Sequence, residues 1–464
     1  MRIPTLAATA VATLLALALA AAPGAALPSE AWPSVVPTAP ATMPDFDGDG
    51  APDIAIGGVE DLRTVQVRYA TGRTQVIARK DLDGSAAYTG FGSSLLARDL
   101  NGDGYADLVI ADAGDRQSAV TQAVFLVPGS AGGLQPSGAQ ALRTPPGLDA
   151  FVTALALVEE PFPVLVLGVA SDRDSSGSLV LWRLGADGRA SGGPVRLSQD
   201  SPGVPGASEK GDAFGTSLAS SGPLLLVGAP GEGVGRTRQA GAVTVLTQQA
   251  DGSFTGTAVT QATRGVPGSA EAEDWFGTAV AAGDGYAVVG VPGEDGGRYG
   301  SAGRIQPFRI SAGTLRPLPP VDQATRGVPG TVEPDDRFGA AVAITRPCSG
   351  AVGVLVGAPG EDVAGNEFAG AAWSIPLTRT ATCGPRSYYR GHGLPGRPSD
   401  IERVGDAVAV LRGRDPSAAD SLLIAGPGSE DGPSGSVYLL ATPTAAATVA
   451  FAHLYSPLGI SLPA

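Results

Sequence analysis

The stretch from Phe91 to Gly114, FGSSLLARDLNGDGYADLVIADAG, decides the fold of this chain. It contains two short apolar runs, Ser94–Ala97 and Leu108–Ala111, separated by an acidic loop that holds two glycines. Short apolar runs bounded by turn-forming residues are typical of β-strands. The stretch therefore predicts a strand, a tight acidic loop and a second strand.

The loop between these strands has the spacing of a cation-binding loop. Oxygen-bearing side chains stand at its first, third and fifth positions, a glycine at the sixth and an acid at the ninth. Calcium takes roughly 6–8 oxygen ligands, and glycine permits the bend that brings them together. A near copy, DFDGDGAPD, begins at Asp45, so we expect about two Ca²⁺ sites. The expected ligands are Asp45, Asp47, Asp49, Asp53 and the Ala51 carbonyl in the first loop, and Asp99, Asn101, Asp103, Asp107 and the Tyr105 carbonyl in the second.

Neither loop has the sequence of a helical calcium hand. That motif needs a glutamate at position 12, where this chain has Ile56 or Ile110 inside a β-branched run. The alternative is a pair of acidic surface turns without metal, which is disfavoured because crowded carboxylates repel one another without a cation. We expect the metal to be structural, since each loop ties two strands together.

Phe91-Gly92, the DLNGDGYAD loop and the later GAPGE strings resemble FG-GAP repeats. Such repeats build the β-propeller of integrin α-subunits and of many bacterial secreted proteins. The resemblance implies an all-β propeller and covers nearly all of the chain after its N-terminal segment. In integrins the metal loops lie in later blades, so the resemblance extends to the loop type and not to the blade number.

Internal repetition supports this architecture. The FG pair or its equivalent recurs at spacings of 60, 63, 62, 62 and 66 residues. About 60 residues that hold four strands form one blade. We expect seven four-stranded blades, with six as the alternative, over residues 45–90, 91–150, 151–205, 206–267, 268–329, 330–395 and 396–456 of a propeller that spans 45–464.

The first repeat lacks an evident FG strand. Either residues 35–42 supply that strand, or a terminal strand over 448–455 closes the ring by pairing with the N-terminal part of the chain. The FG and GAP residues themselves are expected to be structural, with phenylalanine filling the space between blades and proline ending a strand.

The N-terminus predicts export. Residues 1–26 have the basic start, apolar run and small-residue end of a secretory signal peptide, and residues 27–44 form a leader rich in proline and alanine. A membrane anchor is the alternative, but the run is short and rich in alanine. The net charge of −14 argues against nucleic-acid binding. We therefore expect a secreted, extracellular monomer without a membrane span.

The two cysteines, Cys348 and Cys383, are expected to form a disulfide in an oxidising compartment. The alternative is two buried thiols. A bridge would close a loop of about 35 residues and contribute about 3–4 kcal/mol.

The loops that precede the FG pairs carry a recurring acidic pattern. With the glutamates of the PGE strings they could form an acidic rim for a ligand or for further cations, although solvated turns explain them as well. The candidate rim residues are Glu271, Glu273, Asp274, Glu333, Asp335 and Asp336.

Catalysis has little support in the sequence. There is no GxSxG elbow, HExxH or phosphate loop, and the histidines number two, His392 and His453. His392 lies near Tyr388, Tyr389 and Arg390, which form the one cluster to consider for chemistry. We therefore expect a calcium-binding adhesion module for a protein or polysaccharide, with an extracellular hydrolase or lyase using an acidic site, or a structural envelope component, as alternatives.

Overall fold

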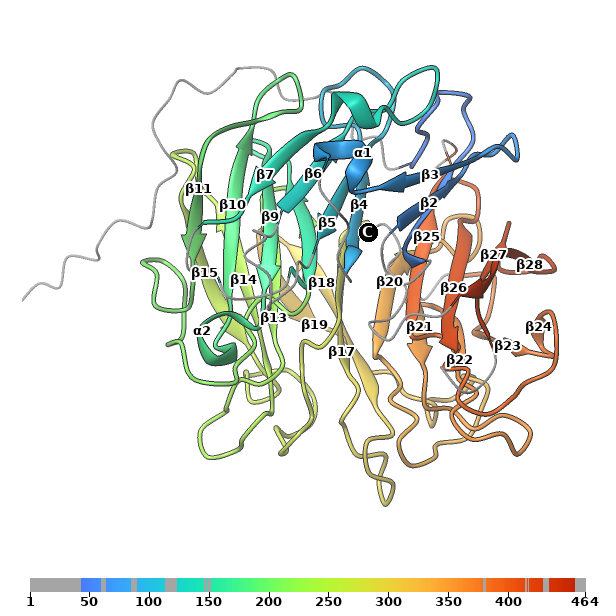
Figure 1. Cartoon of the computed structure of the whole chain (residues 1–464). Coiled ribbons are helices and arrows are strands. Elements are labelled where there is room, and N and C mark those ends of the chain that lie inside the picture. Colours follow the sequence, from blue (N-terminus) through green and yellow to red (C-terminus); the bar gives the residue numbers. More distant parts are fainter. Residues whose placement is uncertain are drawn as a thin grey trace, which may run out of the picture.

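The computed structural model describes residues 43–59, 64–84, 90–112, 123–145, 148, 152–378, 381–413, 415, 417–428 and 434–454. These residues form seven sheets, antiparallel except for the two-residue strand at the edge of the sixth, arranged around a common axis (Figure 1). The predicted all-β propeller of seven blades is confirmed, and the six-blade alternative is wrong. The predicted signal peptide and leader lie outside the described residues, apart from Met43 and Pro44.

Each sheet is built from strands that are consecutive in the sequence. The first sheet is β1 (Ile54–Val59), β2 (Thr64–Arg68) and β3 (Thr74–Ala78). The second is β4 (Phe91–Arg98), β5 (Asp107–Asp112), β6 (Ala123–Val127) and β7 (Gln140–Arg143), and the third is β8 (Ala154–Val158), β9 (Val164–Val169), β10 (Ser178–Leu184) and β11 (Ala190–Leu197). The fourth is β12 (Leu218–Ser221), β13 (Leu224–Ala229), β14 (Ala242–Gln248) and β15 (Phe254–Val259).

The last three sheets complete the ring. The fifth is β16 (Val280–Gly283), β17 (Tyr286–Val291), β18 (Arg304–Ser311) and β19 (Thr314–Pro317). The sixth is β20 (Ala341–Thr345), β21 (Gly353–Ala358), β22 (Ala371–Pro376), β23 (Arg386–Arg390) and the two-residue β24 (Gly393–Leu394). The seventh is β25 (Ala407–Leu411), β26 (Ser421–Gly428), β27 (Ser434–Leu440) and β28 (Thr448–Leu454). Short helical turns are α1 (Lys80–Asp83), η1 (Pro136–Gly138) and α2 (Asp172–Ser175), and none of the described helices is long and apolar enough to cross a membrane.

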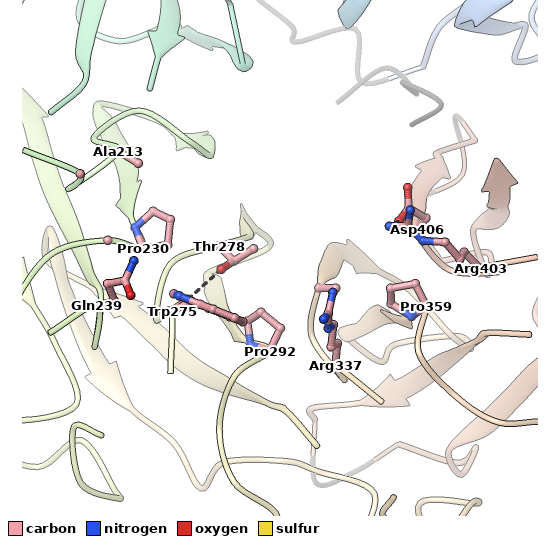
Figure 2. A pocket seen from close by; sticks show the side chains of 13 residues that line it. Ala213, Pro230, Gln239, Trp275, Thr278, Pro292, Arg337, Pro359, Arg403 and Asp406 are labelled. Carbon is pink, nitrogen blue, oxygen red and sulfur yellow. Dashed lines mark hydrogen bonds and ion pairs between the residues drawn. The ribbon is translucent and has the colours of Figure 1, made fainter. Parts of the chain in front are cut away.

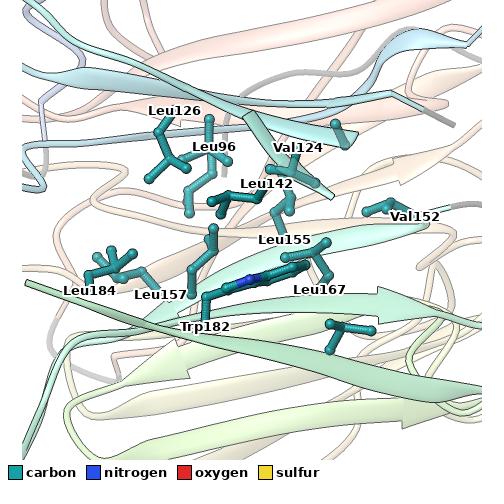
Figure 3. Packing of buried hydrophobic residues seen from close by; sticks show 14 of the residues in the cluster. Leu96, Val124, Leu126, Leu142, Val152, Leu155, Leu157, Leu167, Trp182 and Leu184 are labelled. Atoms are coloured by element: carbon teal, nitrogen blue, oxygen red, sulfur yellow. The ribbon is translucent and has the colours of Figure 1, made fainter. Parts of the chain in front are cut away.

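Apolar side chains fill the space between neighbouring sheets. Figure 3 shows the junction of the second and third sheets, where Leu96 and Leu142 face Leu157 and Trp182. Similar clusters lie at each of the other junctions among the described residues. Sheets buried on both faces require apolar residues at successive positions, which explains the near-continuous apolar second strands such as β13.

The repeated FG, GAP and Ala-Gly residues form one joint between blades. At the junction of the fourth and fifth sheets, the Phe276 amide donates to the Ala240 carbonyl at 3.0 Å. The Phe276 ring is fully buried. The carbonyl of Gly277 lies against Gly228, at a distance that leaves no room for a Cβ atom there. These short motifs are therefore structural, as the sequence predicted.

The ring closes by packing of the first sheet on the last. The strand β28 pairs with β27 in the seventh sheet and with no described part of the N-terminal chain, whose residues 1–42 lie outside the described residues. Residues 35–42, the other candidate, lie outside the described residues. Ile54 and Ile56 of β1 pack against Phe451 of β28, and Nη1 of Arg68 donates to the Ala450 carbonyl at 3.0 Å. The described part of the first sheet thus has three strands, and side chains make the closing contact.

The predicted disulfide is confirmed. Cys348, in the loop between β20 and β21, is bonded to Cys383, in the loop between β22 and β23, with a Cα–Cα distance of 6.2 Å. The bond joins two loops of the sixth sheet.

Candidate functional site

The first acidic loop brings three of its predicted ligands together. Carboxylate oxygens of Asp45, Asp47 and Asp49 lie within 4.8 Å of one another. Asp47 Oδ1 is buried without a hydrogen-bond partner, and Asp47 Oδ2 lies 3.4 Å from Nη2 of Arg73. Buried oxygens are normally satisfied. Three converging carboxylates with one unsatisfied buried oxygen therefore fit a hard divalent cation such as Ca²⁺.

The ninth residue of each loop has a different set of contacts. The two carboxylate oxygens of Asp53 accept the amides of Phe46 at 2.7 Å and Ala70 at 2.9 Å. Burial raises the pKa of Asp53 to about 7, although those hydrogen bonds lower it. Asp53 is therefore placed to hold the loop in shape, next to the three converging carboxylates.

Asp107 repeats this arrangement in the second loop. Its oxygens accept the amides of Leu100 and Gly129, each at 2.9 Å. Burial raises the pKa of Asp107 to about 7, again opposed by these two hydrogen bonds. The same local chain path is thus built twice, once before β1 and once before β5.

The rest of the second loop is closed by its own side chains. The Asp99 carboxylate accepts the amides of Gly102 at 2.7 Å and Gly104 at 3.0 Å. Nδ2 of Asn101 donates to Asp103 Oδ2 at 2.9 Å, and Asp103 Oδ1 accepts the Tyr105 amide. This loop offers the predicted oxygen atoms, but its acids do not converge as closely as those of the first loop.

The two acidic loops contact each other. The amide of Ala106 donates to the Asp45 carbonyl at 2.8 Å. The Tyr105 ring packs over Gly48, at a distance that leaves no room for a side chain at that position. Because the loops share these contacts, a cation in one would restrict the conformation of the other.

A charged network lies at the same end of the ring. In the fifth blade Asp284 occupies the corresponding hairpin, between β16 and β17. Its carboxylate contacts Nη2 of Arg412 at 2.8 Å and Nε of Arg346 at 3.6 Å. These residues belong to the fifth, sixth and seventh blades, so the ion pairs join three blades across the axis.

The predicted acidic rim divides into buried and exposed residues. Asp274 and Asp336 are buried, and each accepts the amide of the residue three positions before it, Glu271 at 2.6 Å and Glu333 at 2.7 Å. These two aspartates therefore shape their own loops. The more accessible members of the rim are Glu271, Glu273, Glu333 and Asp335.

The glutamates of the PGE strings connect successive blades. Gln323, which follows the fifth sheet, donates from Nε2 to Glu361 Oε2 of the sixth at 2.6 Å. Burial and, to a smaller extent, the nearby Asp336 raise the pKa of Glu361 to about 8. The same amide-to-carboxyl contact recurs between Gln261 and Glu294 at 2.7 Å.

The cluster considered for chemistry lies at the outer edge of the sixth blade. The rings of Tyr389 and His392 stack with centroids 5.0 Å apart, and Arg390 pairs with Glu402 of the next blade. Tyr388 is buried, and its hydroxyl donates to the Pro443 carbonyl at 2.8 Å. These contacts connect the sixth and seventh blades.

A pocket of about 410 Å³ lies at the opposite end of the ring from the acidic loops, at the mouth of the axis (Figure 2). Its volume falls within the range of roughly 300–1,000 Å³ that is usual for small-ligand sites. We call it the mouth pocket; four successive blades, the fourth to the seventh, line it. Its lining includes Ala213, Pro230, Gln239, Trp275, Thr278, Pro292, Arg337, Pro359, Arg403 and Asp406.

The side chains that distinguish the mouth pocket come from one repeated position, directly before the FG pair. Trp275, Arg337 and Arg403 occupy it with φ values of 55°, 57° and 55°. The backbone is held there by the preceding blade, since the Arg337 amide donates to the Ser301 carbonyl at 3.1 Å and the Arg403 amide to the Phe368 carbonyl at 3.0 Å. Large residues at positive φ are uncommon, and such strain often accompanies function.

The two arginines of the mouth pocket differ in their partners. Nη2 of Arg403 lies 2.5 Å from Asp406 Oδ1. Arg337 is exposed, and no carboxylate of the described residues lies within ion-pairing distance of it. The mouth pocket therefore has an uncompensated cation in a chain of net charge −14.

Reading the sequence did not find the mouth pocket. Its residues stand about 62 positions apart and differ from repeat to repeat, as A-FG, W-FG, R-FG and R-VG. The one sequence feature that could have indicated the pocket is the change of residue type directly before a motif that is otherwise repeated.

Comparison with known proteins agrees with this architecture. The seven blades around one axis make the molecule a β-propeller. More particularly, it is a propeller that carries FG-GAP-like repeats, since residues 45–110, which contain both acidic loops, match the FG-GAP-like repeat family. No curated protein matches the sequence significantly.

Solved structures with a similar fold share little sequence with this chain. A candidate 6-phosphogluconolactonase from Bacteroides uniformis is 13% identical over 88% of this chain and 98% of its own, with a TM-score of 0.51. A periplasmic gluconolactonase from Pseudomonas aeruginosa is 14% identical over 89% of this chain and 99% of its own, with a TM-score of 0.48. At this identity the first similarity supports the fold alone.

Proposed function

We propose that this protein is a secreted, calcium-binding propeller that acts as a binding or adhesion module for an extracellular protein or polysaccharide. The mouth pocket is the ligand site in this proposal, and Ca²⁺ in the acidic loops stiffens the opposite end. The observation that carries the proposal is Arg337, a cation without an ion-pair partner among the described residues, lining a cavity of ligand size.

Two further features support an extracellular role. A disulfide persists in oxidising compartments, and this chain has one. Extracellular calcium is abundant enough to occupy weak, carboxylate-rich sites such as the first acidic loop. Both features agree with the export signal that the sequence predicts over residues 1–26.

A hydrolase is supported less well. Glycoside hydrolysis commonly uses two carboxyl groups that flank the scissile bond. Asp406 is the one carboxylate among the residues that line the mouth pocket, and Arg403 pairs with it. Asp336, which is buried, contacts its own loop, and Glu361, which is half-buried, contacts Gln323; neither is among the lining residues. We therefore favour binding over catalysis.

The proposal is tested by retention of the purified protein on immobilised cell walls, polysaccharides and matrix proteins. We expect retention on one class of surface, which is lost in the double variant Trp275→Ala/Arg337→Ala. Arg236→Ala, which removes an exposed arginine outside the mouth pocket, is the matched control and should be retained like the wild type. Retention that survives the double variant would place the ligand elsewhere, and no retention on any surface would contradict the proposal.

A further inference from the structure

We infer that the mouth pocket binds the acidic sugar at the end of an anionic saccharide, a residue that bears a carboxylate or a sulfate group. This inference rests on the proposed binding function and specifies its ligand. Its four supports are the charge of the mouth pocket, its aromatic wall, the lack of main-chain donors around its mouth and the exposed acids near it.

The charge of the mouth pocket favours an anion. Two guanidinium groups and one carboxylate line it, and Arg403 already pairs with Asp406. Arg337 is left to bind a ligand. A guanidinium presents a planar pair of N–H donors that matches the two oxygens of a carboxylate or the oxygens of a sulfate.

The opposite wall favours a sugar ring. Figure 2 shows Trp275, Thr278 and Gln239 on one side of the cavity and Arg337, Arg403 and Asp406 on the other. Trp275 is half-buried, and Oγ1 of Thr278 donates to its carbonyl at 2.8 Å. The flat indole can pack against the C–H face of a pyranose, and the nearby amide and hydroxyl groups can meet sugar hydroxyls. A ligand that spans the cavity thus places its ring on one wall and its charge on the other.

The wall offers little to an extended peptide. A peptide that adds to a sheet needs free main-chain donors and acceptors. The amides of Trp275, Arg337 and Arg403 already donate to carbonyls of the preceding blade. The neighbouring lining residues include three prolines without an N–H group, Pro230, Pro292 and Pro359. Recognition therefore depends on side chains, which suits a saccharide better than a peptide strand.

The surroundings favour a chain end over a long polyanion. Glu273 and Asp335 are exposed in the loops that lead to the mouth residues Trp275 and Arg337. A long polyanion would bring further negative charges toward these acids, and physiological salt, with a Debye length of about 8 Å, screens such repulsion only partly at short range. One terminal acidic sugar can reach Arg337 without that repulsion.

The test is calorimetric titration of the purified protein with matched probes. We expect trigalacturonate and a sulfated galactose trisaccharide to bind, and the methyl ester of trigalacturonate, which keeps the shape and lacks the charge, to bind about tenfold or more weakly. A stronger signal from the carboxylate or from the sulfate probe identifies which anion the site prefers. Tri-glutamate, of equal charge, tests for a peptide ligand.

Variants locate the binding. Arg337→Ala should abolish the difference between the acid and its methyl ester, and Arg337→Lys should restore part of it, because lysine keeps the charge without the fork. Trp275→Ala should weaken both probes, whereas Arg236→Ala should change neither. Melting temperatures measured beside each titration show whether the variants are folded.

The outcomes separate this inference from the proposed function. Equal binding of the acid and its ester, or binding of tri-glutamate in place of the saccharides, overturns the ligand class, even if retention on a surface still depends on Trp275 and Arg337. Saccharide binding that is unchanged in folded Arg337→Ala overturns the site. Loss of surface retention in the double variant together with charge-dependent saccharide binding supports both.

Discussion

Glu361 shows what a single half-buried carboxyl group does in this ring. Its Oε2 accepts the amide of Gln323 from the preceding blade, and burial followed by the nearby Asp336 raises its pKa to about 8. A glutamate of the unfolded chain titrates near 4.5. The folded state therefore keeps a proton that the unfolded state releases. Its contribution to stability is fully present below about pH 4.5 and is lost as the pH rises through about 8.

Glu361→Gln should remove this pH dependence, because glutamine resembles the protonated, neutral form. The variant should therefore gain stability relative to wild type as the pH rises. The difference between their free energies of unfolding, variant minus wild type, should be roughly 1–3 kcal/mol larger at pH 9 than at pH 5. Urea unfolding at both pH values, with chelator present so that the acidic loops stay ion-free, measures this difference. Glu273→Gln, at an exposed acid, is the control and should show no such trend. A pH-independent effect of Glu361→Gln would show that the side chain is ionised in the folded state.

The acidic hairpins show how neighbouring elements depend on one another. In each loop the ninth residue holds the main chain, and we propose that the acids before it bind a cation. Among the described residues, the exposed Asp49 accepts one amide, that of Ala51 at 2.8 Å, whereas the fully buried Asp53 accepts two amides. Removal of the Asp49 carboxylate should therefore lower the stability of the protein only when calcium is present. Removal of the Asp53 carboxylate should lower the stability with or without calcium.

Asp49→Ala should lower the melting temperature in calcium and change it little in chelator. The expected loss is about 2.7 kcal/mol when free calcium is 100 times its dissociation constant. Asp103→Ala should behave in the same way, and through the contact of Ala106 with Asp45 it should also weaken calcium binding in the first loop. Asp53→Ala is the contrasting variant, which we expect to be destabilised in both conditions. Equal losses for Asp49→Ala with calcium and with chelator would mean that the loop binds no metal.

At the scale of the whole molecule, the repeat spacing was enough to predict the propeller. Each FG pair begins an inner strand and each GAP string ends a second strand, so a regular interval in the sequence becomes a regular interval around the axis. The acidic loops could also be predicted, because their ligands are contiguous. The mouth pocket could not be predicted. Trp275, Arg337 and Arg403 come from three blades that only the folded ring brings together, and they differ in type although each stands directly before an FG pair or its equivalent. The burial of Asp274 and Asp336 was missed for a related reason, since a charged residue in a loop gives no sign in the sequence that folding will bury it.

The seam between the first and last sheets should open before the other junctions. The seam is held by the side-chain cluster that includes Ile56 and Phe451 and by the hydrogen bond from Arg68 to Ala450. The first sheet contributes three strands to it in the described residues, one fewer than the seventh sheet. Ile56→Ala should cost about 2–5 kcal/mol locally and accelerate amide hydrogen exchange in β1–β3 and β25–β28 together. Leu226→Ala, a buried residue at the junction of the fourth and fifth sheets, is the matched control. Exchange that accelerates evenly around the ring in Ile56→Ala would show that the seam is no weaker than other junctions.

The joint between blades also has an evolutionary consequence. Every blade from the fourth to the sixth supplies the same two halves of that joint, an Ala-Gly pair for the next blade and an FG pair for the one before. A duplicated blade would carry both an FG pair and an Ala-Gly pair, so it could form the joint with the blade on either side. This can explain how a chain lengthens by whole blades without a new core. The residue directly before FG takes part in the joint through its main-chain amide alone, and its side chain changes from Ala213 to Trp275 to Arg337 while the joint stays the same. Selection can therefore diversify what the ring binds one residue per blade, with little effect on whether it folds.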